Sequence, residues 1–458
     1  MRHHGISVEC KNVPVLDPDF SPFYKFRKSF LQGAEEPFGI ALVRNNGQTS
    51  VCNTFIHGGT DSLEADAYYI DRMIKFLLWM KGGYKVLLCG SKSVAQHMIH
   101  AYSKNGSRAF DQAFMSNVYQ QPFSVEMVDE LPTEYSESQD VGYHLDGCRI
   151  GFDAGGSDWK VSAVIDGTAV FSSEVVWHPK TNSNPDYHFS EITKAFRLAQ
   201  EHMPRVDAVG ISSAGIFINN RTRVASLFLQ VAPAEFEAKV QDIYIRAAKE
   251  IGDVPVCVCN DGDVTALAGV MSMEKTNMLG IAMGTSEAAG YVNNNGSITG
   301  WLNELAFAPV DVNPNAMRDE WSGDIGCGVK YFSQDGVVKL ADRAGFTFDE
   351  ALTQAEKLKA VQNAAEEGDM RALQVFADIG VYLGHSLPLY EEFYGFRHVL
   401  LLGRVMSGKG GEILCNRARE VLAEEYPELA ANIEILLPTE KMRRVGQSVA
   451  AASLPKIG

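Results

Sequence analysis

The chain has 458 residues, which exceeds the usual size of one compact domain and predicts two or three. Apolar residues make up 46% and charged residues 21%, and no apolar run is long enough to cross a bilayer. We therefore expect a globular, cytoplasmic protein without a membrane partner. The formal net charge of −16 opposes binding to a phosphate backbone, so nucleic acid is not an expected partner.

The first third of the chain predicts a small α/β module. Phe38–Val43 and Thr49–Ile56 flank an Asn-Asn-Gly turn, a pattern typical of a β-hairpin. Between Ala65 and Met80 the apolar residues recur at helical spacing, and two glycines end the segment. The polar stretch Glu130–Asp140 has no periodicity and predicts a linker. Residues 1–147 are thus expected to form a domain of their own.

A glycine turn follows the next apolar strand. That strand leads Asp153 out at its end, and Gly155, Gly156 and Ser157 turn the chain toward a return strand at Val161–Ile165. Glycines let the turn expose its N–H groups to an anion, which predicts a phosphate site. Asp153 could orient Mg²⁺ or its water, and the alternative is that it only serves the turn at the strand end.

A second acidic motif follows the apolar strand Val254–Cys259. The residues Asn260-Asp261-Gly-Asp263 end that strand and precede a run of small helix formers. A carboxylate at Asp261 could accept the proton of a ligand hydroxyl during phosphoryl transfer. The alternative is that Asp261 only caps the helix beginning at Val264.

Three further segments complete the order of elements. Val206–Gly210 is a strand-like run that leads into a turn of small residues at Ile211–Gly215. Leu279–Val292 predicts a second strand–turn–strand around Gly284-Thr285-Ser286, and Val399–Gly403 is the last apolar strand, followed by a glycine-rich loop and a helix.

This ordered series resembles the ROK family of sugar kinases and repressors, within the actin-like ATPase superfamily, from about Ile150 to the C-terminus. Asp153–Ser157 matches the family's D-x-G-G-T phosphate turn with Ser for Thr. Asn260–Asp263 matches its N-D-x-N segment except at the last residue. Asn303–Phe307 echoes the sugar-gripping G-E-x-G-H element, and Ser322–Val329 echoes the zinc-type C-G-x-x-G-C-x-E run.

The resemblance implies an α/β protein with the two-lobed actin-like ATPase (ribonuclease H-like) fold and an additional N-terminal α/β domain. The first lobe is expected at residues 148–258 plus 440–458 and the second at 259–439. Lys441–Ala452 should form a helix that packs back on the first lobe.

The resemblance also implies the site. Asp261 would be the catalytic base, and Glu304 would bind a ligand hydroxyl, although it could equally lie on a solvated loop. ATP and Mg²⁺ are the expected cofactors, a sugar-like molecule and a nucleotide are the expected partners, and a homodimer is left open. The implied phosphate-binding residues are Asp153, Gly155, Gly156, Ser157, Gly284, Thr285, Ser286 and Gly403, and the implied substrate-binding residues are Asn260, Asp263 and Glu304.

Departures from the family pattern qualify this picture. Phe307 stands where the family has a histidine, and Val329 stands where it has a second sugar-gripping glutamate. Of the zinc cysteines only Cys327 remains, so no structural zinc is expected, because a tetrahedral site needs about four ligands. Glu287 lies in the second phosphate turn, where a carboxylate would repel a polyphosphate, and Arg404 follows Gly403 in place of glycine.

The leading functional hypothesis is an ATP-dependent carbohydrate kinase, a transferase of carbohydrate metabolism. The second is a ligand-binding sensor that keeps the fold without catalysis. The third is a repressor, which we rank last because the helix at Ala65–Met80 carries only Arg72 and Lys75 as cations and offers no basic recognition stripe. We expect the N-terminal module to pack on the kinase-like part and help to shape its ligand site or an oligomer contact.

Overall fold

The computed structural model describes residues 1–137 and 140–458, without the side chains of residues 440–445. The chain forms two compact units. One comprises residues 1–137, 281–289 and 301–436, and the other comprises residues 138–280, 290–300 and 437–458. Positions 138–139 of the expected linker lie outside the described residues.

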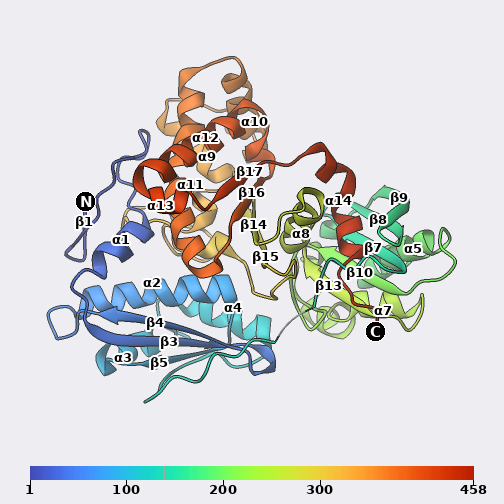
Figure 1. The fold of residues 1–458 in the computed structure, drawn as a ribbon, viewed down its shortest axis with the longest axis horizontal. Coiled ribbons are helices and arrows are strands. Elements are labelled where there is room, and N and C mark those ends of the chain that lie inside the picture. Colours follow the sequence, from blue (N-terminus) through green and yellow to red (C-terminus); the bar gives the residue numbers. More distant parts are fainter. Residues whose placement is uncertain (138–139) are drawn as a thin grey trace. The chain divides into compact units, whose positions relative to one another are not determined.

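The N-terminal part of the first unit is an α/β module built on a sheet of order β4-β3-β5-β6. The predicted hairpin is confirmed, since β3 pairs antiparallel with both β4 and β5. The predicted helix is confirmed as α2, which lies along this sheet (Figure 1) and ends at Gly82, whose φ of 84° an L side chain rarely adopts. The elements are α1 (Phe23–Phe30), β3 (Glu36–Val43), β4 (Thr49–Ile56), α2 (Leu63–Lys81), β5 (Lys85–Cys89), α3 (Lys92–Ala101), α4 (Ala109–Tyr119) and β6 (Ser124–Met127), preceded by the short pair β1 (Arg2–His3) and β2 (Ile6–Ser7).

Helices dominate the rest of the first unit. The long helices α11 and α12 pack closely because two glycines of α11 have no side chain: a Cβ at Gly384 would lie 2.6 Å from that of Val421. A four-stranded sheet of order β15-β14-β16-β17 accompanies them. The elements are β14 (Met278–Met283), β15 (Glu287–Val292), α9 (Gln334–Arg343), α10 (Gln354–Glu366), α11 (Met370–Tyr394), β16 (His398–Leu402), α12 (Gly408–Glu425), α13 (Pro427–Ala430) and β17 (Glu434–Leu436).

The N-terminal segment is fastened to these helices by buried polar contacts. Asp17 accepts hydrogen bonds from Lys339 (3.2 Å) and from the hydroxyl of Tyr382 (2.5 Å). The carboxylate of Asp378 accepts from the backbone N–H of Leu16 at 2.6 Å. Phe23 donates its N–H to the carbonyl of Val310 at 2.9 Å. The expectation that the N-terminal part packs on the kinase-like part is thereby confirmed.

The second unit is built on a five-stranded sheet of order β13-β10-β7-β8-β9. Strands β7, β10 and β13 run parallel, and β8 and β9 are antiparallel additions. One expectation was wrong here: Ile211–Ser213 belong to a strand and not to a turn, because β10 lies between two partners and stays paired to its end. The elements are β7 (Cys148–Ala154), β8 (Asp158–Ile165), β9 (Thr168–Val176), α5 (Pro185–Gln200), β10 (Ala208–Ser213), β11 (Ile216–Ile218), β12 (Arg221–Val224), α6 (Pro233–Glu235), α7 (Ile243–Lys249), β13 (Val256–Asn260), α8 (Asp261–Met273) and α14 (Glu440–Ala452).

The C-terminal helix packs on this sheet, as predicted. Gly151 of β7 and Gly210 of β10 leave room for the α14 backbone, since a Cβ at either position would collide with a carbonyl of α14. The hydroxyls of Ser162 and Ser448 are 2.8 Å apart. The helix is kinked at Gly446, and the side chains of residues 440–445 lie outside the described residues.

Candidate functional site

The first glycine turn connects β7 to β8 and is exposed at Gly156 and Ser157. The indole of Trp177 holds it by donating to the carbonyl of Gly155 at 2.8 Å. A Cβ at Gly155 would lie only 2.6 Å from the carbonyl oxygen of Asp158, so this position requires glycine. The turn is therefore tight, fixed and open to an anion.

Asp153 lies at the carboxyl end of β7, where only 6% of it is exposed. In the sheet register it sits beside Ser212 of β10, whose hydroxyl donates to Oδ1 of Asp153 at 2.8 Å. Burial raises the pKa of Asp153 to about 6, with the Ser212 hydrogen bond opposing that shift and Asp261 adding to it. Asp153 and Asp261 are therefore electrostatic neighbours at one edge of the sheet.

Asp261 is the first residue of α8, and the N-cap is Asn260, whose side chain accepts from the N–H of Gly262 at 2.7 Å. Asp261 is thus not the cap of a helix that begins at Val264, although its Oδ1 accepts from the same N–H at 3.0 Å. Burial raises the pKa of Asp261, while Lys180 acts in the opposite direction. A carboxyl with a raised pKa at a strand end is suited to accept a proton.

The two residues predicted to bind substrate beside Asp261 both have structural partners. The amide nitrogen of Asn260 donates to the carbonyl of Gly215 at 2.7 Å, while its oxygen caps α8. Asp263 is buried and accepts from the N–H of Tyr291 at 3.0 Å. These contacts position α8, and a substrate-binding role for either residue stays a prediction.

Lys180, which the sequence did not single out, also lies at this edge. A Cβ built on Gly156 would be 2.9 Å from the Nζ atom of Lys180, so this ammonium lies directly against the glycine turn. Lys180 also lowers the pKa of Asp261. It follows β9 in a short 3₁₀ turn, Pro179–Thr181, and is exposed. It supplies the cation that a phosphate on the turn would meet.

The second glycine turn, in the other unit, joins β14 to β15. The N–H of Gly284 donates to the carbonyl of Ser286 at 2.9 Å, and Gln334 donates through its side chain to Thr285 at 3.0 Å. Gly403, with φ of 92°, lies against this region, since a Cβ there would collide with the carbonyl of Met283. The structure therefore brings together Gly284, Thr285, Ser286 and Gly403, with Thr285, Ser286 and Gly403 exposed.

Glu304 is held in place by the N-terminal module. Its backbone N–H donates to the carbonyl of Trp79 at 2.9 Å, and that of Asn303 donates to Met80 at 2.9 Å. These carbonyls belong to the last turn of α2, which has no helical donor for them. The N-terminal module thus sets the position of the segment around Glu304, to which the family resemblance assigns substrate binding.

The zinc-type segment is also tied to the module. Asp324 contacts Arg72 (3.0 Å), Lys75 (3.3 Å) and Arg108 (2.8 Å), and the thiol of Cys327 lies 3.6 Å from Asp324. Phe307 lies in an aromatic cluster, with its ring centroid 4.3 Å from that of Trp79. In residues 1–137 and 140–458 no group of three or more His, Cys, Asp or Glu residues could hold a metal ion.

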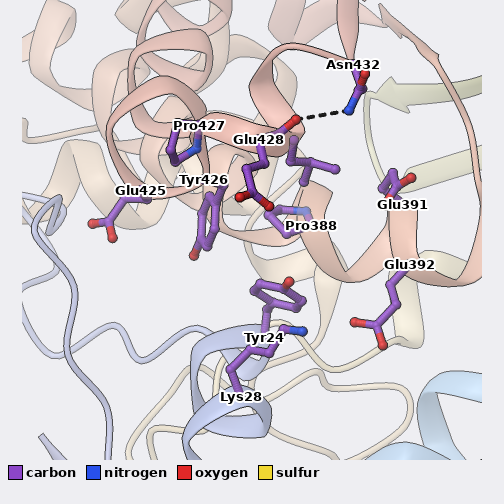
Figure 2. Close-up of a pocket in the computed structure, with 11 residues that line it drawn as sticks. Tyr24, Lys28, Pro388, Glu391, Glu392, Glu425, Tyr426, Pro427, Glu428 and Asn432 are labelled. Carbon is purple, nitrogen blue, oxygen red and sulfur yellow. Dashed lines mark hydrogen bonds between the residues drawn. The ribbon is translucent and has the colours of Figure 1, made fainter.

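A cavity of about 660 Å³ lies elsewhere in the first unit (Figure 2). Its two tyrosine rings, Tyr24 and Tyr426, are 5.6 Å apart and already contact the ammonium groups of Lys28 and Lys25, respectively. Four glutamates also line it, of which Glu425 pairs with Lys25 at 2.7 Å. No predicted site residue lines this cavity, which is therefore separate from the candidate site.

The predicted site residues fall into two sets. Asp153, the turn Gly155–Ser157 and Asn260–Asp263 belong to one unit, and Gly284–Ser286, Gly403 and Glu304 belong to the other. The predicted position of Asp261 in a cleft between lobes stays a prediction. Across the described helices, none is both long and apolar enough to cross a membrane.

The sheets and their glycine turns define a protein with the actin-like ATPase fold and extra N-terminal α/β elements. The chain belongs to the ROK family, whose model matches residues 149–430. A ROK hexokinase from Thermus thermophilus is 19% identical, with a TM-score of 0.51 over 67% of this chain and 96% of that one. A ROK transcriptional regulator, a homologue of the E. coli MLC protein, is 18% identical, with a TM-score of 0.50 over 68% and 79%. These likenesses show the fold, and no curated protein matches the chain.

Proposed function

We propose that the protein is an ATP-dependent carbohydrate kinase of the ROK type, which transfers a phosphoryl group to a sugar hydroxyl. The observation that carries the proposal is the pair Asp153 and Asp261 beside a glycine turn that exposes its backbone, since Asp261 helps to raise the pKa of the buried Asp153. Asp261 accepts the hydroxyl proton, and the turn at Gly155–Ser157 receives phosphate oxygens with Lys180 beside it.

The residues present fit the expected cofactors. Mg²⁺ is commonly held through one or two carboxylates together with substrate phosphates, and Asp153 offers such a carboxylate, directly or through water. When bound, Mg²⁺ neutralises charge on the phosphates of ATP. Gly284, Thr285, Ser286 and Gly403 complete the proposed nucleotide contacts, and Asn260, Asp263 and Glu304 the proposed sugar contacts.

We also propose that residues 1–147 form an accessory domain. The first lobe then comprises residues 148–258 plus 440–458, and the second comprises residues 259–439. The protein acts in the cytoplasm on a small sugar-like substrate, and a homodimer is left open.

A non-catalytic ligand-binding protein is the second candidate. The observation in its favour is that Asn260 and Asp263, both assigned to the substrate by the resemblance, already serve backbone groups of this chain. A repressor remains the third candidate, since the fold is shared with a ROK transcriptional regulator.

The test is ADP release from ATP and Mg²⁺ across a panel of hexoses, hexosamines and polyols. Asp261→Asn should lower turnover by about 10²–10⁴-fold and leave ligand affinity within about threefold, because only a proton acceptor is removed. The matched control is Asp253→Asn, an exposed aspartate of the same unit. Absence of sugar-dependent ADP release in the wild type, with ligand binding intact, would favour the sensor.

A further inference from the structure

Two cysteines lie side by side on β13, the last strand of the sheet in the second unit. Residues two apart in a strand point to the same face, and the sulfur atoms of Cys257 and Cys259 are 3.8 Å apart. Both residues are partly buried, and both are free thiols. The strand therefore presents a pair of adjacent, partly exposed thiols.

The backbone spacing of this pair lies at the upper limit for a disulfide. Residues i and i+2 of an extended strand have Cα atoms about 6.6–6.8 Å apart, whereas disulfides join Cα atoms about 4.4–6.8 Å apart and most often about 5.5–6 Å. A bond between Cys257 and Cys259 is therefore possible, and it favours a shortening of the strand at Val258 by roughly 1 Å.

The outer edge of β13 is able to yield to such a shortening. There the strand is held by a side chain, since Asn220 donates to the carbonyl of Val256 and accepts from the N–H of Val258, both at 2.9 Å. A side chain can follow a small movement of the backbone, whereas a second strand would fix every residue of the edge in register. The dithiol thus lies on a strand that can bend.

The same strand end carries the residues of the candidate site. Cys259 is followed directly by Asn260, which caps α8, and by Asp261. In the sheet register Cys259 lies beside Ser212, whose hydroxyl donates to Asp153 at 2.8 Å. A movement of the backbone at Cys259 therefore reaches both candidate carboxylates.

The environment of the pair also sets the order in which the thiols react. The hydrogen bond with Cys257 and burial raise the pKa of Cys259, and Asp263 adds to the rise. Cys259 therefore stays protonated. Since the thiolate is the nucleophile in thiol–disulfide exchange, Cys257 is the first of the two to attack.

We propose that Cys257 and Cys259 form an oxidative modification site, which a low-molecular-weight disulfide such as oxidised glutathione converts to a disulfide within β13. The thiolate of Cys257 attacks one sulfur of oxidised glutathione, forms a mixed disulfide and releases one glutathione thiol. Cys259 then attacks the sulfur of Cys257, and the second glutathione leaves. The two cysteines lose two protons and two electrons, which convert oxidised glutathione to two thiols.

The new bond shortens the end of β13 and displaces Asn260 and Asp261. The modification site and this displacement go beyond the proposed function and do not depend on it. Only the consequence for turnover rests on the proposed kinase activity.

The first test is peptide mapping of the reduced, folded full chain after incubation with oxidised glutathione and alkylation of the remaining thiols. Tryptic cleavage leaves both cysteines in peptide 250–275, which has no other cysteine. We expect this peptide to lose about 2 Da and to carry neither an alkyl group nor glutathione. In Cys257→Ser and Cys259→Ser the remaining cysteine should be alkylated or hold glutathione. Cys89 is the internal control, because its thiol lies 3.2 Å from the carbonyl of Asp129 and should not form a ring.

The second test is hydrogen exchange of the backbone amides of residues 256–263 before and after oxidation. We expect at least about threefold faster exchange in the oxidised wild type, reversed by dithiothreitol, and no change in Cys259→Ser treated in the same way. If the proposed kinase function holds, oxidation should also lower turnover at least about tenfold, since a displacement of about 1 Å can cost about 100-fold in rate.

Two results would overturn the modification site. One is a peptide 250–275 whose cysteines stay alkylated while Cys89 carries glutathione, and the other is a glutathione adduct on Cys257 that Cys259 never displaces. Ring closure without faster exchange at residues 256–263 would overturn the displacement of Asp261. Ring closure with faster exchange in a protein without sugar-dependent ADP release would sink only the kinase proposal, and full turnover by the oxidised chain would sink only the effect on catalysis.

Discussion

The carboxylate of Asp324 is held by the guanidinium of Arg72, with Oδ2 3.0 Å from Nη1. Arg72 belongs to helix α2 of the N-terminal module, and Asp324 belongs to the segment that resembles the zinc-binding run of the family. Burial disfavours ionisation of Asp324, but Arg72 and Lys75 outweigh it and hold the pKa of Asp324 below its ordinary value. Cations of the module thus fix a segment that in the family carries zinc ligands.

Arg72→Ala should destabilise the protein by about 3–5 kcal/mol, because it leaves Asp324 and Asp71 buried with fewer cationic partners. The measurement is urea unfolding at pH 7. Arg197→Ala is the control. Arg197 and Glu250 form an exposed ion pair at 3.4 Å, so removing it should leave the urea unfolding midpoint unchanged. A midpoint for Arg72→Ala equal to that of the control would show that the ion pairs do not hold the segment.

Purified protein should contain no stoichiometric zinc. Ser322, Phe307 and Val329 occupy positions where the family offers ligands or their neighbours, and Cys327 is buried beside Asp324. Elemental analysis after dialysis against a chelator-free buffer checks this expectation. One zinc per chain, lost in Cys327→Ser, would mean that other residues have taken over the site.

Lys180→Ala should weaken the interaction with the nucleotide, with KM for ATP raised by about tenfold, because the ammonium lies against the phosphate turn. It should also move the acidic limb of the pH–rate profile upward, since Lys180 lowers the pKa of Asp261. Lys194→Ala, an exposed lysine of α5, is the matched control. An unchanged KM and an unchanged pH profile would remove Lys180 from the site.

Glu287 should make stability fall as pH rises. Its pKa is about 8 in the folded protein against an ordinary 4.5, so between these values the folded state keeps a proton that the unfolded state has released. The free energy of unfolding therefore decreases across pH 4.5–8, by up to about 1.4 kcal/mol per unit. The difference in stability between wild type and Glu287→Gln separates the contribution of Glu287 from those of Asp153 and Asp311, whose pKa values are also raised. Parallel curves of unfolding free energy against pH for the two proteins would contradict a contribution from Glu287.

Features with local causes could be predicted from the sequence. The Asn-Asn-Gly turn, the end of α2 at Gly82 and the glycine turn after Asp153 all follow from backbone preferences of a few adjacent residues. Helix α8 was expected too, but its start was placed three residues late, because Asn260 and not Asp261 provides the cap.

Features that depend on distant residues could not be predicted. Ser212 looked like part of a turn, and only its position between β7 and β13 makes it a strand residue that donates to Asp153. Lys180 reaches the glycine turn from the far end of β9. Glu287 looked like a charge in a loop, and the contact with Gly328 that buries it joins separate parts of the chain.

The full chain should not bind DNA. Nucleic-acid affinity needs several cationic contacts that release counterions. On α2, however, Arg72 and Lys75 are buried in pairs with Asp324 and Asp111, so they are not available to a phosphate backbone. Electrophoretic mobility shift with genomic fragments at low salt checks this. Residues 1–147 expressed alone should aggregate, because Phe76 loses its contact with Tyr390 and Trp79 loses its contact with Phe307. Salt-sensitive, sequence-selective binding by either protein would promote the repressor hypothesis over the kinase.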